Sequence, residues 1–371
     1  MKTIGIVAEF NPFHEGHKYL IEQAKKDTDA DICVVVMSGN FVQRGMPAVF
    51  DKWKRAEAAV KQGVNLVVEL PAVYAVNSAE YFAKGAIEVL EGLGGVDILA
   101  FGSEAGDLDA LRSAAAFLKV SDDLLKDRIQ LLMREGYSHP KAREIAVLEA
   151  EHDFDDRLIK EPNNILGIEY LKQIETLQPY TVKRQGKGYH ASASEIRARM
   201  EEEQPGRSRE IADIFYRMAA MKILQMPIEE LTRYFAADAG LANKLKKEIR
   251  YADSLETLID RVKSKVYTRT RICRLLAHIL LEIREEDVTQ AVSYARVLAF
   301  DGNGAKFLKD IRKREVNTIP VITNINKEAG RYPEIRGTLE KDILASDIYN
   351  LLTGENLYEM ADYTQRPYIN Q

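Results

Sequence analysis

The sequence predicts an α/β fold with a doubly wound parallel sheet in the first part of the chain, followed by an all-helical second domain. Two observations predict it. In the first half, short apolar runs alternate with stretches of helical period, as in proteins built from strand–helix–strand units. After residue 204, nearly every stretch has the period of a helix.

The strands expected in the first half are short apolar segments that end at turn residues. Pro71 and Gly102, for example, directly follow two of them and stop a strand from continuing. We expect strands at 3–8, 31–37, 64–70 and 97–101, a further strand at 181–184, and helices at 16–26, 52–62 and 79–93. Strands without polar positions are typical of a parallel sheet that helices cover on both faces.

The helices expected in the second half are separated by short loops. We expect them at 209–225, 228–235, 241–251, 255–264, 268–283, 287–300 and 304–314. An isolated strand is expected within 316–322 and a last helix at 344–353. Glu201–Gly206 is the most linker-like stretch. We therefore place the domain boundary there, with residues 1–203 in the first domain and residues 204–371 in the second.

The composition is that of a globular protein without a membrane segment. The chain has 371 residues, of which 46% are hydrophobic and 29% charged, and chains of this length usually form about two domains. No apolar run reaches the ~18 residues of a membrane span, and Met1 is followed at once by a strand-like segment rather than a secretory signal. Cys33 and Cys273 lie in apolar surroundings, which indicates reduced core thiols. We expect a cytoplasmic protein.

The net charge of −5 is unevenly distributed along the chain. Residues 241–275 contain ten Lys or Arg against four Asp or Glu, and residues 296–314 contain six against two. A local basic surface binds phosphates even in an acidic protein. The cations that we select as nucleic-acid contacts surround Tyr267, whose ring is suited to stacking on a base: Lys263, Lys265, Arg269, Arg271 and Arg274. The alternative is an ordinary solvated helix face.

The strongest functional signal is the segment Asn11–Lys18, directly after the first strand. Ligands of open α/β sheets bind at the carboxyl ends of strands, and a helix that begins there directs its free N–H groups toward phosphate. His14 and His17 are three residues apart, so they share one face of the first turn and can both donate hydrogen bonds to a triphosphate. Gly16 lets the backbone come close. The alternative is a pair of surface histidines at a helix start.

Two segments are similar to known signatures. His14-Glu-Gly-His17 matches the H-x-G-H signature of the nucleotidylyltransferase superfamily, and Ala191–Arg197 is similar to its second signature, I-S-S-T-x-I-R. Alternatively, Ser192 and Ser194 are simple helix caps. Further segments, taken together, resemble the bacterial tRNA(Met) cytidine acetate ligase family over most of the chain: Val7–His17, Met37–Gly45, Phe101–Glu104, Pro162–Leu166, Lys183–Arg184 and Tyr267–Ile272.

The resemblance implies a Rossmann-like nucleotidylyltransferase domain that binds ATP, followed by a helical tRNA-binding domain. It implies ligation of acetate to N4 of the wobble cytidine of elongator tRNA(Met) through an acetyl-adenylate, with Mg²⁺ expected beside ATP. Catalysis is assigned to His14, His17 and Lys18. ATP contacts are assigned to Val7, Ala8, Glu9, Phe10, Asn11, Pro12, Phe13, His14, Glu15, Gly16, His17, Lys18, Tyr19, Leu20, Gly102, Asn163, Arg184, Ser194 and Arg197.

Some of these assignments have structural alternatives. Gly102 is equally an ordinary turn glycine, and Asn163, which we prefer over Asn164 as the ATP ligand, is also a candidate helix cap. The segment Ser38–Pro47, which contains Arg44, is expected either to line the acetate or cytidine site or to be a solvent loop. The remaining histidines show no spacing typical of metal ligands, so we expect no metal site formed by the protein: His139, His152, His190 and His278.

The implied chemistry suits these residue types. Acetate is a poor acyl donor because its leaving oxygen is basic, and attack on the α-phosphorus of ATP turns that oxygen into a phosphate leaving group, with positioned donors stabilising the charge. Two other functions stay open: a nucleotidylyltransferase that forms a dinucleotide from ATP and a small phosphorylated substrate, and a non-catalytic RNA-binding protein. One departure from the family is that His190 is followed almost at once by Ser192, where the family usually has Tyr-His-Asp and a longer loop.

Overall fold

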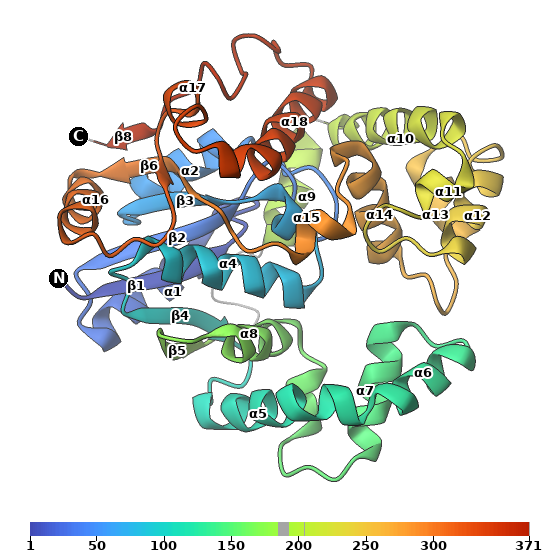
Figure 1. The fold of residues 1–371 in the computed structure, drawn as a ribbon, viewed down its shortest axis with the longest axis horizontal. Helices are drawn as coiled ribbons and strands as arrows, with labels where there is room; N and C mark the ends of the chain where they lie inside the picture. The colour runs from blue at the N-terminus through green and yellow to red at the C-terminus, as the bar shows by residue number, and fades with distance from the viewer. Residues whose placement is uncertain (185–192, 204, 371) are drawn as a thin grey trace.

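The computed structural model describes residues 1–184, 193–203 and 205–370. At the centre of this described part lies an eight-stranded sheet in the order β5-β4-β1-β2-β3-β6-β7, with β8 paired to β6 (Figure 1). The strands are β1 (Thr3–Ala8), β2 (Ile32–Ser38), β3 (Leu66–Leu70), β4 (Ile98–Ser103), β5 (Gln178–Lys183), β6 (Ala295–Asp301), β7 (Val321–Ile322) and β8 (Tyr368–Asn370).

Helices connect and cover these strands. They are α1 (Glu15–Thr28), α2 (Lys52–Lys61), α3 (Ala72–Ala75), α4 (Ala79–Leu93), α5 (Leu108–Leu124), α6 (Lys126–Arg134), α7 (His139–Glu149), α8 (Pro162–Gln173), α9 (Ala193–Glu203), α10 (Arg207–Gln225), α11 (Ile228–Leu231), α12 (Ala239–Glu248), α13 (Leu255–Val262), α14 (Arg269–Leu281), α15 (Glu285–Thr289), α16 (Gly302–Arg314), α17 (Ile325–Glu328) and α18 (Arg336–Thr353), with short 3-10 helices at Asp156–Ile159 and Pro333–Ile335.

The first five strands form the doubly wound parallel sheet that the sequence predicts, and the mostly parallel sheet confirms the α/β class. β2 and β3 extend the sheet on one side of β1, whereas β4 and β5 lie on the other side, and all five strands are parallel. The direction of winding therefore reverses between β1 and β4. Loops diverge at such a switch point, and ligands of open α/β sheets bind there.

Strand β2 shows why the sheet has helices on both faces. Cys33 and Val35 pack in the core with α1 and α2, whereas Val34 and Val36 pack in the core with α4 on the opposite face. Side chains alternate between the faces of a strand. A strand that is covered on both faces therefore has apolar residues at every position, and all of β2 is buried.

The second half is not helical throughout, which corrects the prediction. The helix expected at 287–300 is wrong beyond Thr289, because residues 295–301 are strand β6, which pairs antiparallel with β3. β7 and β8 then pair with β6. The apolar run Val297–Ala299 is too short for its period to distinguish a strand from a buried helix. Pairing with β3 makes this segment a strand. The division of the chain at residues 203 and 204 stays a prediction.

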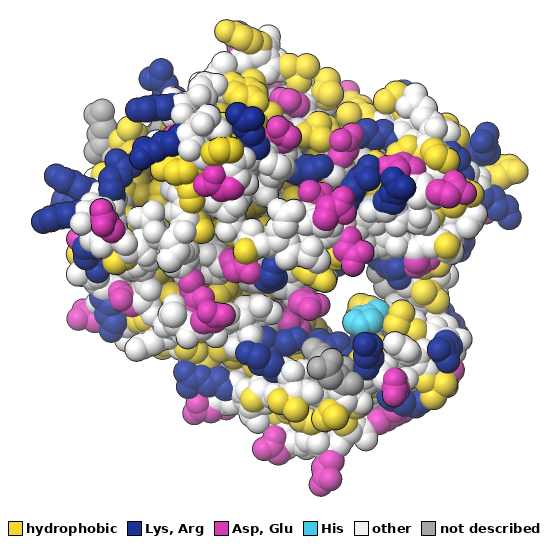
Figure 2. Space-filling model, viewed as in Figure 1, with side chains coloured by type: hydrophobic (Ala, Val, Ile, Leu, Met, Phe, Trp, Pro, Cys, Tyr) yellow, Lys and Arg dark blue, Asp and Glu magenta, His cyan; other side chains and the backbone are white. Residues whose placement is uncertain are grey.

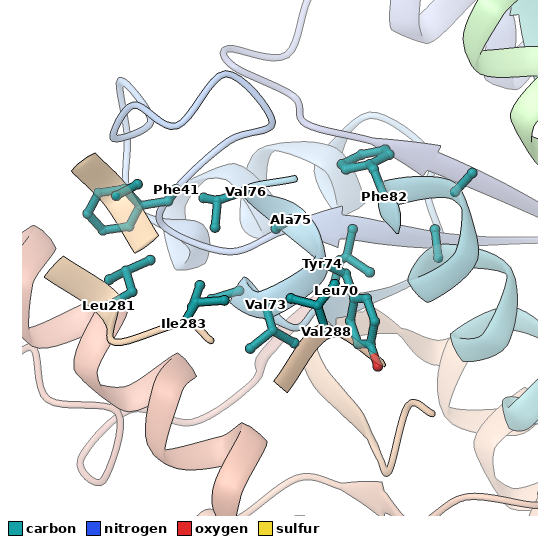
Figure 3. Packing of buried hydrophobic residues seen from close by; sticks show 14 of the residues in the cluster. Phe41, Leu70, Val73, Tyr74, Ala75, Val76, Phe82, Leu281, Ile283 and Val288 are labelled. Atoms are coloured by element: carbon teal, nitrogen blue, oxygen red, sulfur yellow. The ribbon is translucent and has the colours of Figure 1, made fainter. Parts of the chain in front are cut away.

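One hydrophobic core joins the helices of the second half to the sheet. Figure 3 shows Leu281 beside Phe41, which follows β2, and Ile283 beside Val73 of α3. His278 of α14 adds a polar contact, because its Nε2 lies 2.8 Å from the carbonyl oxygen of Val76. These contacts fix α14 against the loops at the carboxyl ends of β2 and β3.

A buried ion network attaches β6 and the C-terminal segment to β3. Lys52 Nζ lies 2.7 Å from Glu69 Oε1 and 2.9 Å from Asp362 Oδ2. Arg296 Nη1 lies 2.6 Å from the same Asp362 oxygen. Buried charges are stable only when they are paired. The charge of each residue in the network is therefore stabilised by the charges of the others. Ion pairs as well as backbone hydrogen bonds hold strand β6 to the parallel sheet.

The thiols are buried as expected. Cys33 and Cys273 are free, and burial raises the pKa of the Cys33 thiol to about 12, so Cys33 has little thiolate character at neutral pH. In the described part of the chain, no helix is both long enough and apolar enough to cross a membrane.

Candidate active site

The turn after β1 places two histidines at the start of α1. His14 is the N-cap residue, and its Nδ1 accepts a hydrogen bond from Gly16 N at 3.0 Å. His17 Nδ1 accepts one from His14 N at 3.3 Å, which completes a capping box. Reciprocal caps satisfy N–H groups that a helix start otherwise leaves without partners. A Cβ on Gly16 would stand 2.9 Å from the His14 ring, so glycine permits this close approach.

The caps also decide which ring nitrogen carries the proton. Because each Nδ1 accepts a hydrogen bond, the proton of each neutral ring resides on Nε2. The rings of His14 and His17 are stacked, with centroids 3.7 Å apart. Burial, followed by the charges of His14 and Arg184, holds the pKa of His17 well below its usual range. His17 is therefore a neutral Nε2–H donor near pH 7.

Three residues expected to contact ATP lie together at the carboxyl ends of β4 and β5. A Cβ on Gly102 would stand 3.5 Å from Arg184 Cγ, and Arg184 Nη1 donates to Asn163 Oδ1 at 3.2 Å. The effect of Arg184 on the pKa of His17 shows that its charge acts on the histidine turn. The structure thus brings Gly102, Asn163 and Arg184 to the same switch point as His17.

Glu104 also belongs to this group, although the sequence predicts no role for it. Its Oε1 accepts from Asn163 Nδ2 at 2.5 Å, and its Oε2 accepts from Asn164 N at 2.9 Å. Asn164 is fully buried and its Oδ1 accepts from Ala105 N at 3.0 Å. Asn164 therefore holds the loop, whereas Asn163 is only half-buried, which favours Asn163 as the ligand. The available signal was the position of Glu104 directly after a strand at the switch point.

Arg197 reaches the histidine turn from α9. Its Nη1 donates to the carbonyl oxygen of Asn11 at 2.6 Å. Burial, together with the nearby charge of Arg44, lowers the pKa of Arg197. Ser194 lies in the first turn of α9, but its side chain is outside the described part, as are Ser192 and His190. The structure therefore places one residue of the second signature at the site and does not describe the serines.

Arg55 of α2 joins the loops that follow β1 and β2. Its buried guanidinium donates to the carbonyl oxygens of Glu9 at 2.6 Å and Ser38 at 3.1 Å, and to that of Gly39. These carbonyls lie at the carboxyl ends of neighbouring strands, so a single side chain holds both loops. The sequence predicts that Arg55 either lines the acetate or cytidine site or lies in solvent, and its burial excludes the second alternative.

The basic stretch at residues 263–274 does not form one surface. Lys263 and Lys265 are exposed, whereas Arg274 donates from Nε to the carbonyl oxygen of Gln43 at 2.7 Å. Burial lowers the pKa of Arg274 to about 10. Arg274 therefore lies beside the loop after β2 rather than on the outer surface.

The two arginines within the stretch already have anionic partners. Arg269 forms two hydrogen bonds with Glu256. Arg271 donates to Asp238 at 2.7 Å and lies over the ring of Tyr267, 5.4 Å from its centroid. Such pairs reduce the net charge that a phosphate meets. The tRNA-binding role of these five cations stays a prediction.

A parallel sheet with a His-x-Gly-His turn at its switch point, and with Arg184 and Arg197 close to that turn, is the arrangement expected of the nucleotidyl transferase class. The model of the HIGH Nucleotidyl Transferase family matches residues 1–364 of the chain. This match covers the histidine turn, the switch point and the helices of the second half.

Similarity to named enzymes narrows the nucleotidyl transferase class to one family. The tRNA(Met) cytidine acetate ligase of Caldicellulosiruptor saccharolyticus is 36% identical over 402 residues, with 99% of this chain and 98% of that protein covered. The enzyme of the same name from Halothermothrix orenii is also 36% identical and covers 95% of each chain. The crystal structure of Thermotoga maritima TmcAL bound with α-thio-ATP has a TM-score of 0.88 at 27% identity and covers 100% of this chain and 99% of that one. The chain belongs to the tRNA(Met) cytidine acetate ligase family.

Proposed function

We propose that this protein ligates acetate to N4 of the wobble cytidine of elongator tRNA(Met) and converts ATP to AMP and pyrophosphate. The observation that carries the proposal is the capped His14–His17 turn at the switch point, in a chain 36% identical to a tRNA(Met) cytidine acetate ligase over nearly its full length. A solved relative is bound to an ATP analogue, which supports ATP as the nucleotide. The reaction would take place in the cytoplasm, where tRNA is modified.

The first half-reaction in this proposal is attack of an acetate oxygen on the α-phosphorus of ATP. Negative charge then spreads over the phosphate oxygens. The Nε2–H groups of His14 and His17 and the ammonium group of Lys18 would stabilise that charge. Donors that are fixed before the reaction act strongly, and removal of one typically costs about 10²–10³ in rate.

The nucleoside and the outer phosphates would occupy the two sides of this turn. Gly102 has no side chain, so a ribose or base can approach the end of β4 closely. Asn163 is proposed as a polar ligand there, while Arg184 and Ser194 are proposed to bind phosphates. Arg197 would act beside them and also holds the turn through the Asn11 carbonyl.

Mg²⁺ is proposed to arrive with ATP. Within the described residues, no three His, Cys, Asp or Glu side chains are placed to hold a metal ion. Phosphate oxygens and waters would therefore be its main ligands, as is usual for Mg²⁺. When bound, the ion supplies neutralisation of the phosphate charge.

The tRNA is proposed to bind mainly to the helical half. Figure 2 shows a hollow between the α5–α7 and α10–α14 helices, with Lys and Arg side chains along its lower rim. Lys263 and Lys265 are exposed cations next to α13 and α14. Contacts of this kind with phosphates supply much of the affinity of proteins for nucleic acids.

The test is mass analysis of tRNA nucleosides after incubation of the protein with tRNA(Met), ATP and ¹³C-labelled acetate. The expected product is labelled N4-acetylcytidine, which should be absent when ATP is omitted. Pyrophosphate release that requires a small phosphorylated substrate, without acetate or tRNA, would support the dinucleotide-forming alternative. Binding of tRNA without any consumption of ATP would support the non-catalytic alternative.

A further inference from the structure

Polar residues from four other parts of the chain lie near Glu9, the residue after β1. Gln43 donates its backbone N–H to Glu9 Oε1 at 3.0 Å, and its carbonyl oxygen accepts from Arg274 Nε at 2.7 Å. The charge of Glu9 also acts on Arg197 of α9 and on Tyr170 of α8. We call Glu9, Gln43, Tyr170, Arg197 and Arg274 the Glu9 cluster.

Two donors of the Glu9 cluster are buried without a partner. The Nε2 group of Gln43 and the hydroxyl group of Tyr170 form no hydrogen bond with any described residue. Tyr170 as a whole is only 2% exposed. A buried polar group that lacks a partner destabilises the native state, so its retention points to a ligand or an ordered water that completes it.

Glu9 also has a carboxylate oxygen that is available as a hydrogen-bond acceptor. The hydrogen bond from Gln43 N occupies Glu9 Oε1, and no hydrogen bond from a described residue reaches Oε2. Toward the described residues, Arg274 likewise donates a hydrogen bond only from Nε. Glu9, five residues before His14, is thus linked through the Gln43 backbone to the Arg274 guanidinium, and the unpartnered Gln43 side-chain amide belongs to the same group of residues.

We propose that the Glu9 cluster binds the Watson–Crick edge of the acceptor cytosine and that Glu9 takes the proton from N4. This inference rests on the proposed function. Cytosine presents an N4–H₂ donor, which carboxylates recognise, beside the acceptors N3 and O2. The Gln43 amide and the Arg274 guanidinium supply donors for those two acceptors. A base in a single-stranded loop is able to turn out of its stack into such a site.

The transfer step balances with Glu9 as the proton acceptor. The N4 lone pair attacks the acetyl carbon of acetyl-adenylate, a C–N bond forms, and the C–O bond to the phosphate breaks as AMP leaves. One N4 proton passes to Glu9 and then to solvent. The amine of cytosine is a weak nucleophile because its lone pair is delocalised into the ring, so a positioned base should contribute about 10²–10⁴ in rate.

Glu9→Gln tests this role with little disturbance of the loop. The amide oxygen of glutamine still accepts the hydrogen bond from Gln43 N, so the variant removes the base and its charge but keeps the shape. Glu22→Gln, on the exposed side of α1, is the matched control for a loss of one negative charge. Two rates are measured on each purified full-length protein: acetate-dependent ATP–pyrophosphate exchange, and single-turnover transfer from preformed acetyl-adenylate to tRNA(Met).

The expected result for Glu9→Gln is a fall of at least about 100-fold in transfer, which exceeds any fall in exchange by at least about tenfold, with tRNA affinity within about threefold. Glu22→Gln should match the wild-type protein in both rates. An equal fall of both rates, or an unchanged transfer rate, would overturn the inference. If the wild-type protein shows neither exchange nor transfer, the proposed function fails, and the inference fails with it.

Discussion

Arg274 of α14 donates its Nε–H to the backbone carbonyl oxygen of Gln43, at 2.7 Å and across 231 positions of the sequence. Gly45, two residues further along that loop, packs directly on the backbone of α14. A Cβ on Gly45 would stand only 2.5 Å from Arg274 N. The helical half therefore holds the loop that follows β2, and this loop in turn contacts Glu9 at the site.

Gly45→Ala should separate the loop from α14. Gly45 has a φ of 77°, and Gly136 has a φ of 94° with nothing within 4 Å of a Cβ. Both substitutions force alanine into the left-handed region, which costs about 1–2 kcal/mol, but only Gly45→Ala adds a clash worth about 1–3 kcal/mol more. Urea unfolding should show this difference, and acetylation should fall only for Gly45→Ala. Equal effects of the two variants on stability and activity would show that the contact has no role.

Substitutions at His14 separate its capping role from its catalytic role. His14→Ala should lose about 1 kcal/mol of stability through the missing cap and about 10²–10³ in acetate-dependent pyrophosphate release through the missing donor. Asparagine is a good N-cap residue, so His14→Asn should keep the stability and still lose the activity. A near-wild-type rate for His14→Asn would show that the ring does not bind phosphate. Urea unfolding and pyrophosphate release are measured on both variants.

The low pKa of His17 makes a prediction about acid stability. Burial, then the charges of His14 and Arg184, lowers this pKa in the folded protein, so the unfolded chain takes up a proton first as the pH falls. Neutral His17 contributes fully to the free energy of unfolding above about pH 6.5, which is the usual pKa of histidine in an unfolded chain. This contribution is lost as the pH falls from there through the pKa of His17 in the folded protein. The wild-type protein should therefore lose more stability between pH 7 and pH 5 than His17→Asn, by up to about 1.4 kcal/mol for each pH unit below 6.5. Identical pH profiles of the free energy of unfolding would contradict the shift.

The sequence predicts the N-terminal sheet well and the return of the chain to that sheet poorly. Strand β1 and helix α4 have the predicted bounds, because apolar runs with clear turn residues are local signals. Strand β6 was mistaken for a helix, since its pairing with β3 depends on residues more than 200 positions away. Long-range pairing of this kind leaves no periodic pattern in a short segment.

The candidate site shows the same difference between local sequence signals and long-range packing. His14, His17 and Arg184 follow strand ends and Gly102 lies near the end of β4, and the topology alone places such residues together. By contrast, the hydrogen bond of Arg274 to the Gln43 carbonyl requires the packing of α14 on the sheet. A count of charges cannot reveal it, because buried and exposed arginines are identical in sequence.

Lys263 and Lys265 give a cleaner test of tRNA binding than the arginines beside them. Both lysines are exposed, whereas loss of Arg269 or Arg271 would also leave a carboxylate partner behind. Lys263→Ala with Lys265→Ala should weaken tRNA binding and flatten the dependence of log K on log salt by up to about two units. Exchange between ATP and pyrophosphate should persist. An unchanged salt dependence would place the tRNA-binding surface elsewhere on the protein.

Reaction with ¹⁸O-labelled acetate determines whether acetate is activated as an adenylate. An acetate oxygen attacks the α-phosphorus, and transfer of the acetyl group to N4 leaves that oxygen on the phosphate. We expect one ¹⁸O atom in AMP for each N4-acetylcytidine formed, measured by mass spectrometry of the nucleotide pool, with unlabelled pyrophosphate as the other product. Label in inorganic phosphate with release of ADP, or AMP without label, would contradict it.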